Sequence, residues 1–380
     1  MATKGDCTVT AQSGYRFTPR GSSMEMLSVF MPIVGTLVFV PLLATYATKF
    51  HLVDLPDVRK RHFEAVPLVG GLAMFAAFLT TCGVGGTFAD IHPAFFVGAA
   101  MMLTIGAADD RWNLPALPRF AMQALAIWLA VSLSGNVLSD LGELVSPQML
   151  ALGAFAAPFT VFGILGVVNA VNLIDGADGL AGGIAFTALA WFFAAVALLQ
   201  ADGAVPASFS DPSNILLALM GAVLGFLCLN MRTPLRARAG VFMGDGGSLF
   251  IGFVLGWFAV ATTSQFHPDH LSPVSALWIL IVPLFDTVAC MSRRILSGRS
   301  PMRPDRKHVH HLLEACGLST GQAVSVLIVI NALGGLVGVI GWRCGVPEYV
   351  LFAAIAGCFV AYVVVSTVAW NRIQKTAPTE

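Results

Sequence analysis

Long apolar runs separated by short polar connections recur along the whole chain. Eleven of these runs are long enough to form a membrane-spanning helix, because about 20 apolar residues in a helix cross a bilayer. They lie at residues 26–48, 68–88, 92–108, 119–135, 150–171, 179–200, 214–230, 247–266, 274–296, 321–343 and 348–370. The pattern therefore predicts an all-α, polytopic integral membrane protein with about eleven transmembrane helices.

The composition agrees with this class. Hydrophobic residues make up 57% of the 380 residues and charged residues 11%, whereas roughly a quarter of the residues of a soluble domain are charged. The seven cysteines show no spacing typical of a zinc site or a disulfide framework. We expect a transmembrane domain at 25–372, a disordered N-terminal tail at 1–24 and a C-terminal tail at 373–380, with Met24 or Met26 as alternative starts.

The distribution of lysine and arginine predicts which way the helices run. When the connection after the first run is placed in the cytoplasm, all but four of the 21 basic residues fall on the cytoplasmic side. The exceptions are Lys4, Arg16, Arg20 and Arg343. Basic residues are enriched in the cytoplasmic loops of membrane proteins. We therefore expect an external N terminus, a cytoplasmic C terminus, and a site open to the cytoplasm where the charged connections meet.

The connection NLIDGADGLAGG carries three polar side chains between two apolar runs. Asn172, Asp175 and Asp178 are spaced by three, so that in a helical segment they would share one face. Carboxylates next to hydrocarbon are costly and usually mark a functional site. Such a cluster of oxygen ligands suits a hard cation such as Mg²⁺. A glycine-rich hairpin that binds nothing is the alternative interpretation.

Two further acidic motifs stand where apolar runs end or begin. Asp109 and Asp110 follow the third run, and adjacent residues of a helix point about 100° apart. One of them is therefore free to face a reaction while a basic partner such as Arg111 or Arg119 holds the other, unless both simply end a solvated helix. Asp245, in VFMGDGGSL, precedes the eighth run, where helix N–H groups can bind phosphate. Phe242 suits stacking on a nucleobase or anchoring at the membrane interface.

Basic residues and histidines gather in two connections. The last large one contains Arg303, His308, His310 and His311. This set suits anionic phosphate better than a metal, because it is strongly basic and has no cysteine at ligand spacing; a loop that is basic only for orientation is the alternative. The first connection contains Lys60 and His62. Asp286 lies inside the ninth run, where we expect a buried partner for a loop arginine, with a proton relay as the alternative.

Five motifs occur together, in one order, between residues 26 and 343. They are VDLPDVRKRH followed by PLVGG, AADDR, NLIDGADGLAGG, VFMGDGGSL and SPMRPDRKHVHHL. In these motifs the chain resembles the polyprenyl-phosphate N-acetylhexosamine-1-phosphate transferases. Its His-x-His-His form is similar to the bacterial branch that uses UDP-GlcNAc and undecaprenyl phosphate, whereas the MurNAc-pentapeptide branch usually has three consecutive histidines. The chain departs from the pattern in having Leu117 and Arg119 where relatives often place a lysine.

The resemblance implies a role for each candidate site residue. The expected catalytic residues are Asp109, Asp110, Asp175, His308, His310 and His311. The expected substrate-binding residues are Asp178, Phe242, Arg303, Lys60, His62 and Arg119. Asp245 and Asn172 would hold Mg²⁺, with Mn²⁺ as an alternative cation. Among these residues, Asp178 and Phe242 would bind the uracil, and the aspartate pair of the third run would address the lipid phosphate.

The reaction implied by the resemblance is transfer of GlcNAc-1-phosphate from UDP-GlcNAc to undecaprenyl phosphate at the bacterial inner membrane, the first membrane step of O-antigen or common-antigen synthesis. Positioning and electrostatics should dominate it, because a phosphate monoester is already mostly dianionic at neutral pH. A two-step route through an aspartyl-phosphate stays open. The other candidates are another UDP-HexNAc donor, a secondary transporter and a sugar-nucleotide-binding protein without transfer. Membrane lipid is an expected partner, nucleic acid is not, and a homodimer is left open.

Overall fold

The computed structural model describes residues 22–54, 65–144, 148–201, 212–232, 236, 238–264, 270–298, 300 and 308–376. Its helices, in chain order, are α1 (Ser22–Ala47), α2 (Gly70–Gly85), α3 (Pro93–Trp112), α4 (Ala116–Ser134), α5 (Ala156–Ile174), α6 (Leu180–Ala201), α7 (Pro212–Asn230), α8 (Gly244–Ser264), α9 (Pro273–Ile279), α10 (Ile281–Leu296), α11 (Val309–Ala315), α12 (Thr320–Arg343) and α13 (Glu348–Thr376). An antiparallel pair joins β1 (Val53–Asp54) to β2 (Val66–Pro67), and two 3₁₀ turns are η1 (Thr87–Asp90) and η2 (Gly153–Phe155). The predicted all-α class is confirmed in this part of the chain.

Most of these helices have the length and composition that a membrane requires. Within the described ranges, eight are long and apolar enough to cross a bilayer, and the bent pair α9–α10 makes a ninth when it is counted as one span. With 16 residues, α2 is shorter. The last turn of α3 contains Asp109 and Asp110, which lower its mean hydropathy. The protein is a multi-pass membrane protein, while the total of eleven spans and their orientation stay predictions.

The ninth predicted span, 274–296, is not one straight helix. The chain breaks at Leu280 between α9 and α10, whose axes are bent by 86°. Pro283 has no N–H to donate and therefore cannot continue the hydrogen bonds of α9. Asn331 of α12 accepts from the N–H of Val282 at 3.4 Å and so satisfies one group at the break. The prediction of a continuous helix was wrong because a uniformly apolar run does not reveal where its hydrogen bonding is interrupted.

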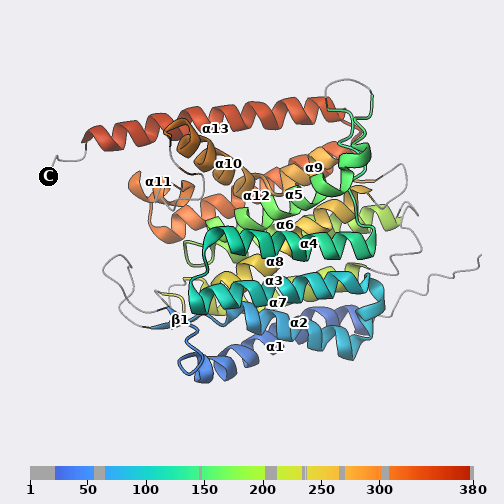
Figure 1. Ribbon diagram of the computed structural model, residues 1–380, viewed down its shortest axis with the longest axis vertical. Coiled ribbons are helices and arrows are strands. Elements are labelled where there is room, and N and C mark those ends of the chain that lie inside the picture. The colour runs from blue at the N-terminus through green and yellow to red at the C-terminus, as the bar shows by residue number, and fades with distance from the viewer. Residues whose placement is uncertain are drawn as a thin grey trace, which may run out of the picture.

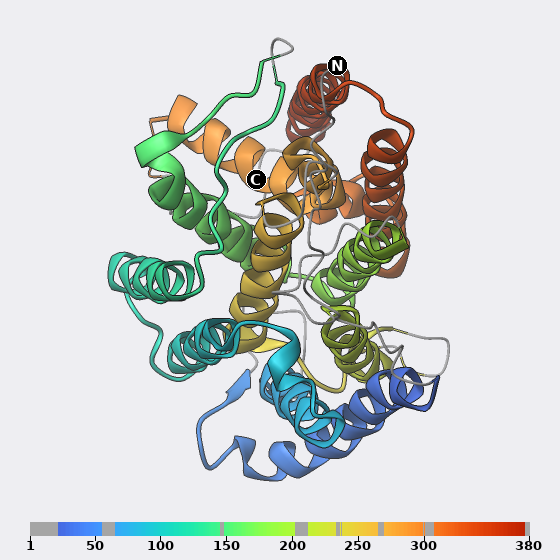
Figure 2. The same cartoon turned by 90° about the vertical axis from the view of Figure 1, so that its right-hand side faces the viewer.

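The helices pack around α8. Its membrane-length stretch is 94% buried, whereas those of α1 and α13 are 22% and 17% buried. Packed against α8 are α3 and α5, and α1 packs against α2 and α7. Figure 2, which looks along most of the helices, shows α1 and α13 at opposite edges of the bundle. The most enclosed helix is thus the one that begins at Gly244, beside the predicted metal ligand Asp245.

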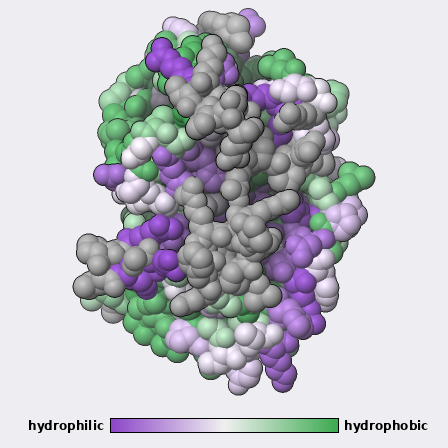
Figure 3. Space-filling model, turned by 90° about the vertical axis from the view of Figure 1, so that its left-hand side faces the viewer, coloured by the Kyte–Doolittle hydropathy of each residue, from purple (hydrophilic) through white to green (hydrophobic). Residues whose placement is uncertain are grey.

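Five segments meet at one end of the bundle, which we call the loop end (Figure 1). It holds the β1–β2 pair, the α3–α4, α5–α6 and α7–α8 connections, and α11. Backbone hydrogen bonds join two of them, since the N–H of Phe242 donates to Pro67 at 3.0 Å and the N–H of Gly70 donates to Phe242 at 3.0 Å. Figure 3 faces this end and shows hydrophilic residues around its centre, with hydrophobic residues mainly at its edges. The described members of the predicted site all lie at the loop end.

Candidate active site

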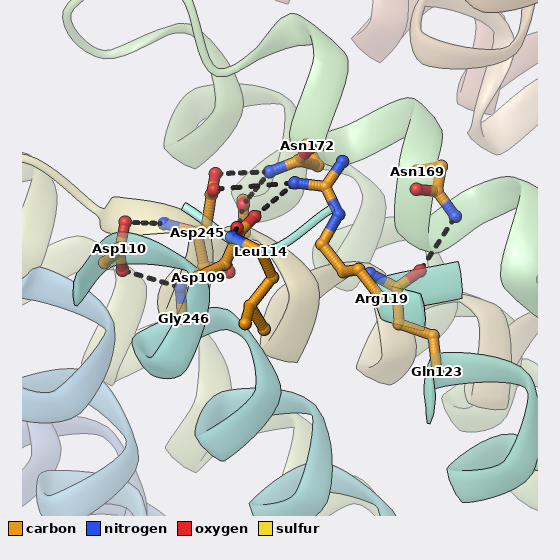
Figure 4. Close-up of polar contacts among 10 residues, drawn as sticks. Asp109, Asp110, Leu114, Arg119, Gln123, Asn169, Asn172, Asp245 and Gly246 are labelled. Carbon is orange, nitrogen blue, oxygen red and sulfur yellow. Dashed lines mark hydrogen bonds and ion pairs between the residues drawn. The ribbon is translucent and has the colours of Figure 1, made fainter. Parts of the chain in front are cut away.

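The start of α8 is held by an aspartate from another helix. Asp110, in the last turn of α3, accepts hydrogen bonds from the N–H groups of Asp245 at 2.8 Å and Gly246 at 3.0 Å (Figure 4). A helix begins with N–H groups that have no partner inside it, so a carboxylate at this place stabilises the helix start. The approach requires Gly106, where a Cβ would lie 2.3 Å from the carbonyl oxygen of Asp245. Asp110 therefore fixes the position of Asp245.

Asp109 has a different set of partners. Its side chain is 5% exposed and one oxygen accepts from the N–H of Leu114 at 2.7 Å. The other oxygen forms an ion pair with Arg119 of α4. The same guanidinium lies 3.8 Å from a carboxylate oxygen of Asp245. Arg119 thus pairs with Asp109, as the sequence suggested. Its guanidinium also places a positive charge next to Asp245, within the group of carboxylates that we call the acidic cluster (Asp109, Asp110, Asp175 and Asp245).

Asn172, near the end of α5, reaches across to α8 (Figure 4). Its amide nitrogen donates to Oδ1 of Asp245 at 2.7 Å and to Oγ of Ser248 at 2.9 Å. The side chain of Asp245 keeps 37% of its surface exposed, much more than that of Asp109. Its carboxylate is therefore open to a ligand. The two residues predicted to bind a metal, 73 positions apart in the chain, are neighbours in the structure.

Negative charge accumulates around Asp245. Asp175 directly follows α5, and burial together with the charges of Asp245, Asp110 and Asp178 raises its pKa to about 8. Carboxylates crowded in this way repel one another, and a bound cation relieves that repulsion. Carboxylate and amide oxygens are also the ligands that Mg²⁺ prefers. The residues present therefore fit a divalent cation at Asp245, with Asn172 and Asp175 beside it.

Asp178 and Phe242 border a neighbouring part of the loop end. Asp178 accepts a hydrogen bond from Nε of Arg232 at 2.7 Å and one from the N–H of Ala239 at 3.3 Å. Both donors belong to the α7–α8 connection, which also contains the half-buried Phe242. The sequence placed these two residues together only through a resemblance. The structure joins Asp178 directly to the connection that carries Phe242.

The short helix α11 places His310 against the α5–α6 connection, whose residues 175–179 read DGADG and which we also call the DGADG connection. A Cβ built on Gly176 would lie 3.1 Å from Nε2 of His310. His310 is 2% exposed, and neither of its ring nitrogens has a hydrogen-bond partner among the described residues. Burial and the charges of His311 and His308 lower the pKa of His310 to about 4. At neutral pH this imidazole is therefore uncharged.

His308, in contrast, is protonated at neutral pH. Its Nδ1 lies 2.7 Å from Oδ2 of Asp286, and although burial opposes the charge, the hydrogen bond with Asp286 raises the pKa of His308 to about 10. Asp286 is buried, as expected from its position. Its closest side-chain partners among the described residues are His308 and Tyr362, not an arginine of the loop. Among the described residues, the loop brings positive charge to Asp286 through the imidazole of His308. The expected loop arginine stays a prediction, because Arg303 and Arg306 lie outside the described residues. His311 faces Glu314 at 4.0 Å.

Several residues that build the site were missed in the sequence. Asn230 accepts from the N–H of Gly179 at 2.7 Å and donates to the carbonyl of Val241 at 2.8 Å, so it joins the α5–α6 and α7–α8 connections. An amide at the end of an apolar run was the available signal. Ser248 and Arg232 were missed as well, because the neighbouring sequence does not distinguish either of them from an ordinary serine or a basic loop residue. The predicted residues Lys60, His62 and Arg303 lie outside the described residues.

Comparison with known proteins identifies the family of the chain. The model of glycosyl transferase family 4 matches residues 92–263. The chain is 36% identical to an undecaprenyl-phosphate alpha-N-acetylglucosaminyl 1-phosphate transferase of Haemophilus influenzae, over 91% of this chain and 95% of the relative. Relatives with the same name from Salmonella typhi and Escherichia coli K12 are 35% and 34% identical, and each comparison covers 89% of this chain and 89% and 91% of the relative. The chain therefore belongs to glycosyl transferase family 4.

Proposed function

We propose that this protein transfers GlcNAc-1-phosphate from UDP-GlcNAc to undecaprenyl phosphate, releasing UMP and forming undecaprenyl-diphospho-GlcNAc. The observation that carries the proposal is the meeting of four distant segments at the loop end, through Asp109, Asp175, Asp245 and His310. It occurs in a chain that matches relatives named for this reaction over about nine-tenths of its length. The product would begin a surface polysaccharide of the O-antigen or common-antigen type.

The reaction is a phosphoryl transfer in which both partners are anionic. An oxygen of the lipid phosphate forms a bond to the β-phosphorus, while the bond from that phosphorus to the oxygen of UMP breaks and UMP leaves with the electron pair. A phosphate monoester is mostly dianionic at neutral pH, so the nucleophile needs no base. Asp109 is engaged with Arg119 and Leu114. Its role is to orient Arg119 toward the incoming phosphate, which follows from the dominance of positioning and charge in such reactions.

A divalent cation belongs in this scheme. Asp245 would hold it, with Asn172 and Asp175, and Mg²⁺ or Mn²⁺ suits these oxygen ligands. When bound, the cation supplies positive charge to the diphosphate and to the leaving UMP. Asp110 acts on this part of the site from a distance, because it fixes the start of α8. His310, uncharged and buried, offers a hydrogen bond to a phosphate oxygen without adding charge.

The nucleotide and the membrane complete the assignment. Asp178 and Phe242 would hold the uracil, whose N3–H would replace one of the two donors that Asp178 accepts from. Lys60, His62 and Arg303, outside the described residues, would contact the phosphates. The loop end would face the cytoplasm of a bacterium, at the inner membrane, since the sugar nucleotide is made there and the basic connections point to that side.

The test is transfer by the purified protein in detergent micelles. UMP release from UDP-GlcNAc should require both undecaprenyl phosphate and a divalent cation, and a lipid-linked sugar should appear in equal amount. Release without the lipid, or binding without release, would contradict the transfer and favour a binding protein. A preference for another UDP-HexNAc would change the donor and keep the reaction. Asp245→Asn should abolish turnover, whereas Asp140→Asn, which lies beyond α4 at the opposite end, should not.

A further inference from the structure

One buried carboxylate, outside the acidic cluster, forms hydrogen bonds with two other segments of the chain. Asp286 of α10 is 1% exposed. It accepts hydrogen bonds from Nδ1 of His308 at 2.7 Å, from the N–H of Val309 at 2.8 Å and from the hydroxyl of Tyr362 at 3.0 Å. These donors lie at the start of α11 and in the middle of α13. A buried carboxylate is tolerated only when donors or a cation compensate its charge, and here both are present.

These contacts fix the segment that carries the other two histidines. Val309 is the first residue of α11, and its N–H has no partner within that helix. Asp286 accepts from it and so caps α11 from a neighbouring helix. His310 lies one position further on and contacts the DGADG connection near Gly176. The carboxylate in α10 therefore sets both the ring of His308 and the start of the helix that delivers His310.

The hydrogen bond also decides which atom of His308 is available. Nδ1 is bound to Asp286, so Nε2 is the ring nitrogen left to donate to a ligand. A histidine that keeps its proton presents a permanent positive charge, and an imidazolium can stabilise a diphosphate through a charge-assisted hydrogen bond. The rings of His308 and His310 lie 6.0 Å apart and nearly parallel. One ring is charged and the other neutral, so they are suited to different contacts with the same substrate.

We propose that Asp286 is a positioning residue for the transfer reaction, and that it holds His308 as a fixed imidazolium whose Nε2 donates to a phosphate of the sugar nucleotide. The inference rests on the proposed function of the loop end. Asp286 itself contacts no substrate in this scheme and acts only through His308 and α11. Its partner Tyr362 carries the restraint to α13, the helix that follows the last connection of the chain.

A metal site built on the same atoms is the competing interpretation. Ligand atoms of Asp286, Cys290 and His308 lie within 4.8 Å of one another. However, Nδ1 of His308 is bound to the carboxylate, and a guanidinium nitrogen of Arg293 lies 3.0 Å from the sulfur of Cys290. A guanidinium next to the sulfur repels a second cation. The cluster is therefore satisfied by hydrogen bonds.

The charge of His308 depends on the groups that face it. Those from α10 are Asp286, Cys290 and Arg293, those from α11 are His310 and His311, and the one from α13 is Tyr362. Among the negative or potentially negative groups, Asp286 is the closest to the ring. Removing its charge leaves His308 beside a guanidinium and two other imidazoles, which disfavours the imidazolium.

The test is Asp286→Asn in the full-length protein. The amide oxygen still accepts a hydrogen bond, but the negative charge is lost. We expect kcat/KM for UDP-GlcNAc at pH 8 to fall at least about 30-fold, because most of His308 is then neutral. The alkaline side of the pH profile should show a new decline that begins at or below about pH 6.5, the ordinary pKa of a histidine. An unchanged pH profile would overturn the proposal.

Two further variants show whether Asp286 acts through His308. In the double variant Asp286→Asn with His308→Gln, activity should be no lower than with His308→Gln alone, because the effects of coupled residues do not add. Additive losses would mean that Asp286 acts elsewhere. Asp90→Asn is the matched control, since Asp90 is also a carboxylate with 1% exposure but lies before α3, at the opposite end. It should leave the pH profile unchanged.

A readout without turnover separates this inference from the proposed function. In ¹⁵N-histidine-labelled protein, the His308 signal, assigned by its loss in His308→Gln, should stay protonated at pH 8 and become neutral in Asp286→Asn. If this holds and the wild-type protein transfers no sugar phosphate, the proposed function fails and the pairing stands. A His308 signal that is neutral in the wild type would sink the inference. So would zinc in the purified wild type that Asp286→Asn removes.

Discussion

The two adjacent aspartates of α3 divide their contacts. Asp109 binds Arg119 and the N–H of Leu114, whereas Asp110 binds the first N–H groups of α8. A turn of 100° between neighbouring helix positions makes this division possible. From the dipeptide alone neither partner could be assigned, because both lie on other helices or beyond the helix end. The arrangement makes Asp110 a residue that positions Asp245, the proposed metal ligand, through the start of α8.

Asp110→Asn tests this division. An asparagine has one acceptor oxygen, so one of the two N–H groups at the start of α8 loses its partner, which costs about 1 to 3 kcal/mol. We expect a lower unfolding temperature and a reduced affinity for the divalent cation, measured by the cation dependence of turnover. Asp109→Asn should weaken the contact with Arg119 and leave cation affinity nearly unchanged. Equal cation affinities in the two variants would contradict the division.

His310 predicts a pH dependence of stability. Its pKa is about 4 in the folded protein, against about 6.5 for an exposed histidine. Between these values the unfolded chain binds a proton that the folded chain does not, so stability is lost as the pH falls from about 6.5 toward 4. The loss amounts to about 3 kcal/mol. Asp175, whose pKa is raised to about 8, shifts stability in the opposite direction in this window. The contribution of His310 is therefore measured as the difference between the wild type and His310→Gln in thermal unfolding in detergent. The wild type should lose stability relative to His310→Gln as the pH falls, and a difference that stays constant across the window would contradict the burial argument.

At the scale of elements, two glycines allow the backbones of the helices that carry the site to come into contact. A Cβ on Gly106 of α3 would lie 2.3 Å from the carbonyl oxygen of Asp245, and a Cβ on Gly71 of α2 would lie 2.2 Å from the Cα of Gly247. Both contacts are with the backbone of α8, which cannot rotate away as a side chain can. The first turn of α8 is therefore enclosed by α2 and α3, and its position depends on two small residues.

Gly106→Ala should separate α3 from α8. Overpacking of this kind typically costs about 1 to 3 kcal/mol, and it moves Asp245 relative to Asn172. We expect at least a tenfold loss of transfer, with the protein still inserted in the membrane. Gly163→Ala in α5 is the control, because no atom lies within 4 Å of a Cβ at that glycine. A Gly106→Ala protein as active as the control would show that α8 tolerates displacement.

The sequence predicted elements better than contacts between them. Long apolar runs suffice for helices, since every backbone group in a bilayer must be satisfied within its own segment. The break at Leu280 escaped because Pro283 stands in an uninterrupted apolar run. The pairing of Asp286 with His308 and of Asp178 with Arg232 escaped for another reason. Such contacts depend on how helices that are far apart in the chain pack together. The spacing of residues along the sequence carries no information on this packing.

At the scale of the whole molecule, the site follows from the way the connections alternate. From α1 to α8, successive helices run in opposite directions, so every second connection returns to the loop end (Figure 1). The acidic and basic motifs fall in those connections, and hydrophilic residues gather on that face (Figure 3). A charged substrate can therefore reach Asp245 from water without crossing hydrocarbon. The lipid substrate must come from the side, because its chain belongs to the bilayer. This arrangement fixes one face as the working side but leaves its orientation to be tested.

Two native cysteines provide that test, since they flank α12 on opposite sides. Cys316 follows α11 at the loop end and Cys344 follows α12, and both are exposed. The 24 residues of α12 span about 36 Å, enough to cross the membrane. In cells that carry variants with a single cysteine, a membrane-impermeant maleimide added from outside should label Cys344 and not Cys316. After lysis it should label both. Labelling of Cys316 in intact cells would place the acidic cluster outside, away from cytoplasmic sugar nucleotides, and would exclude the proposed reaction.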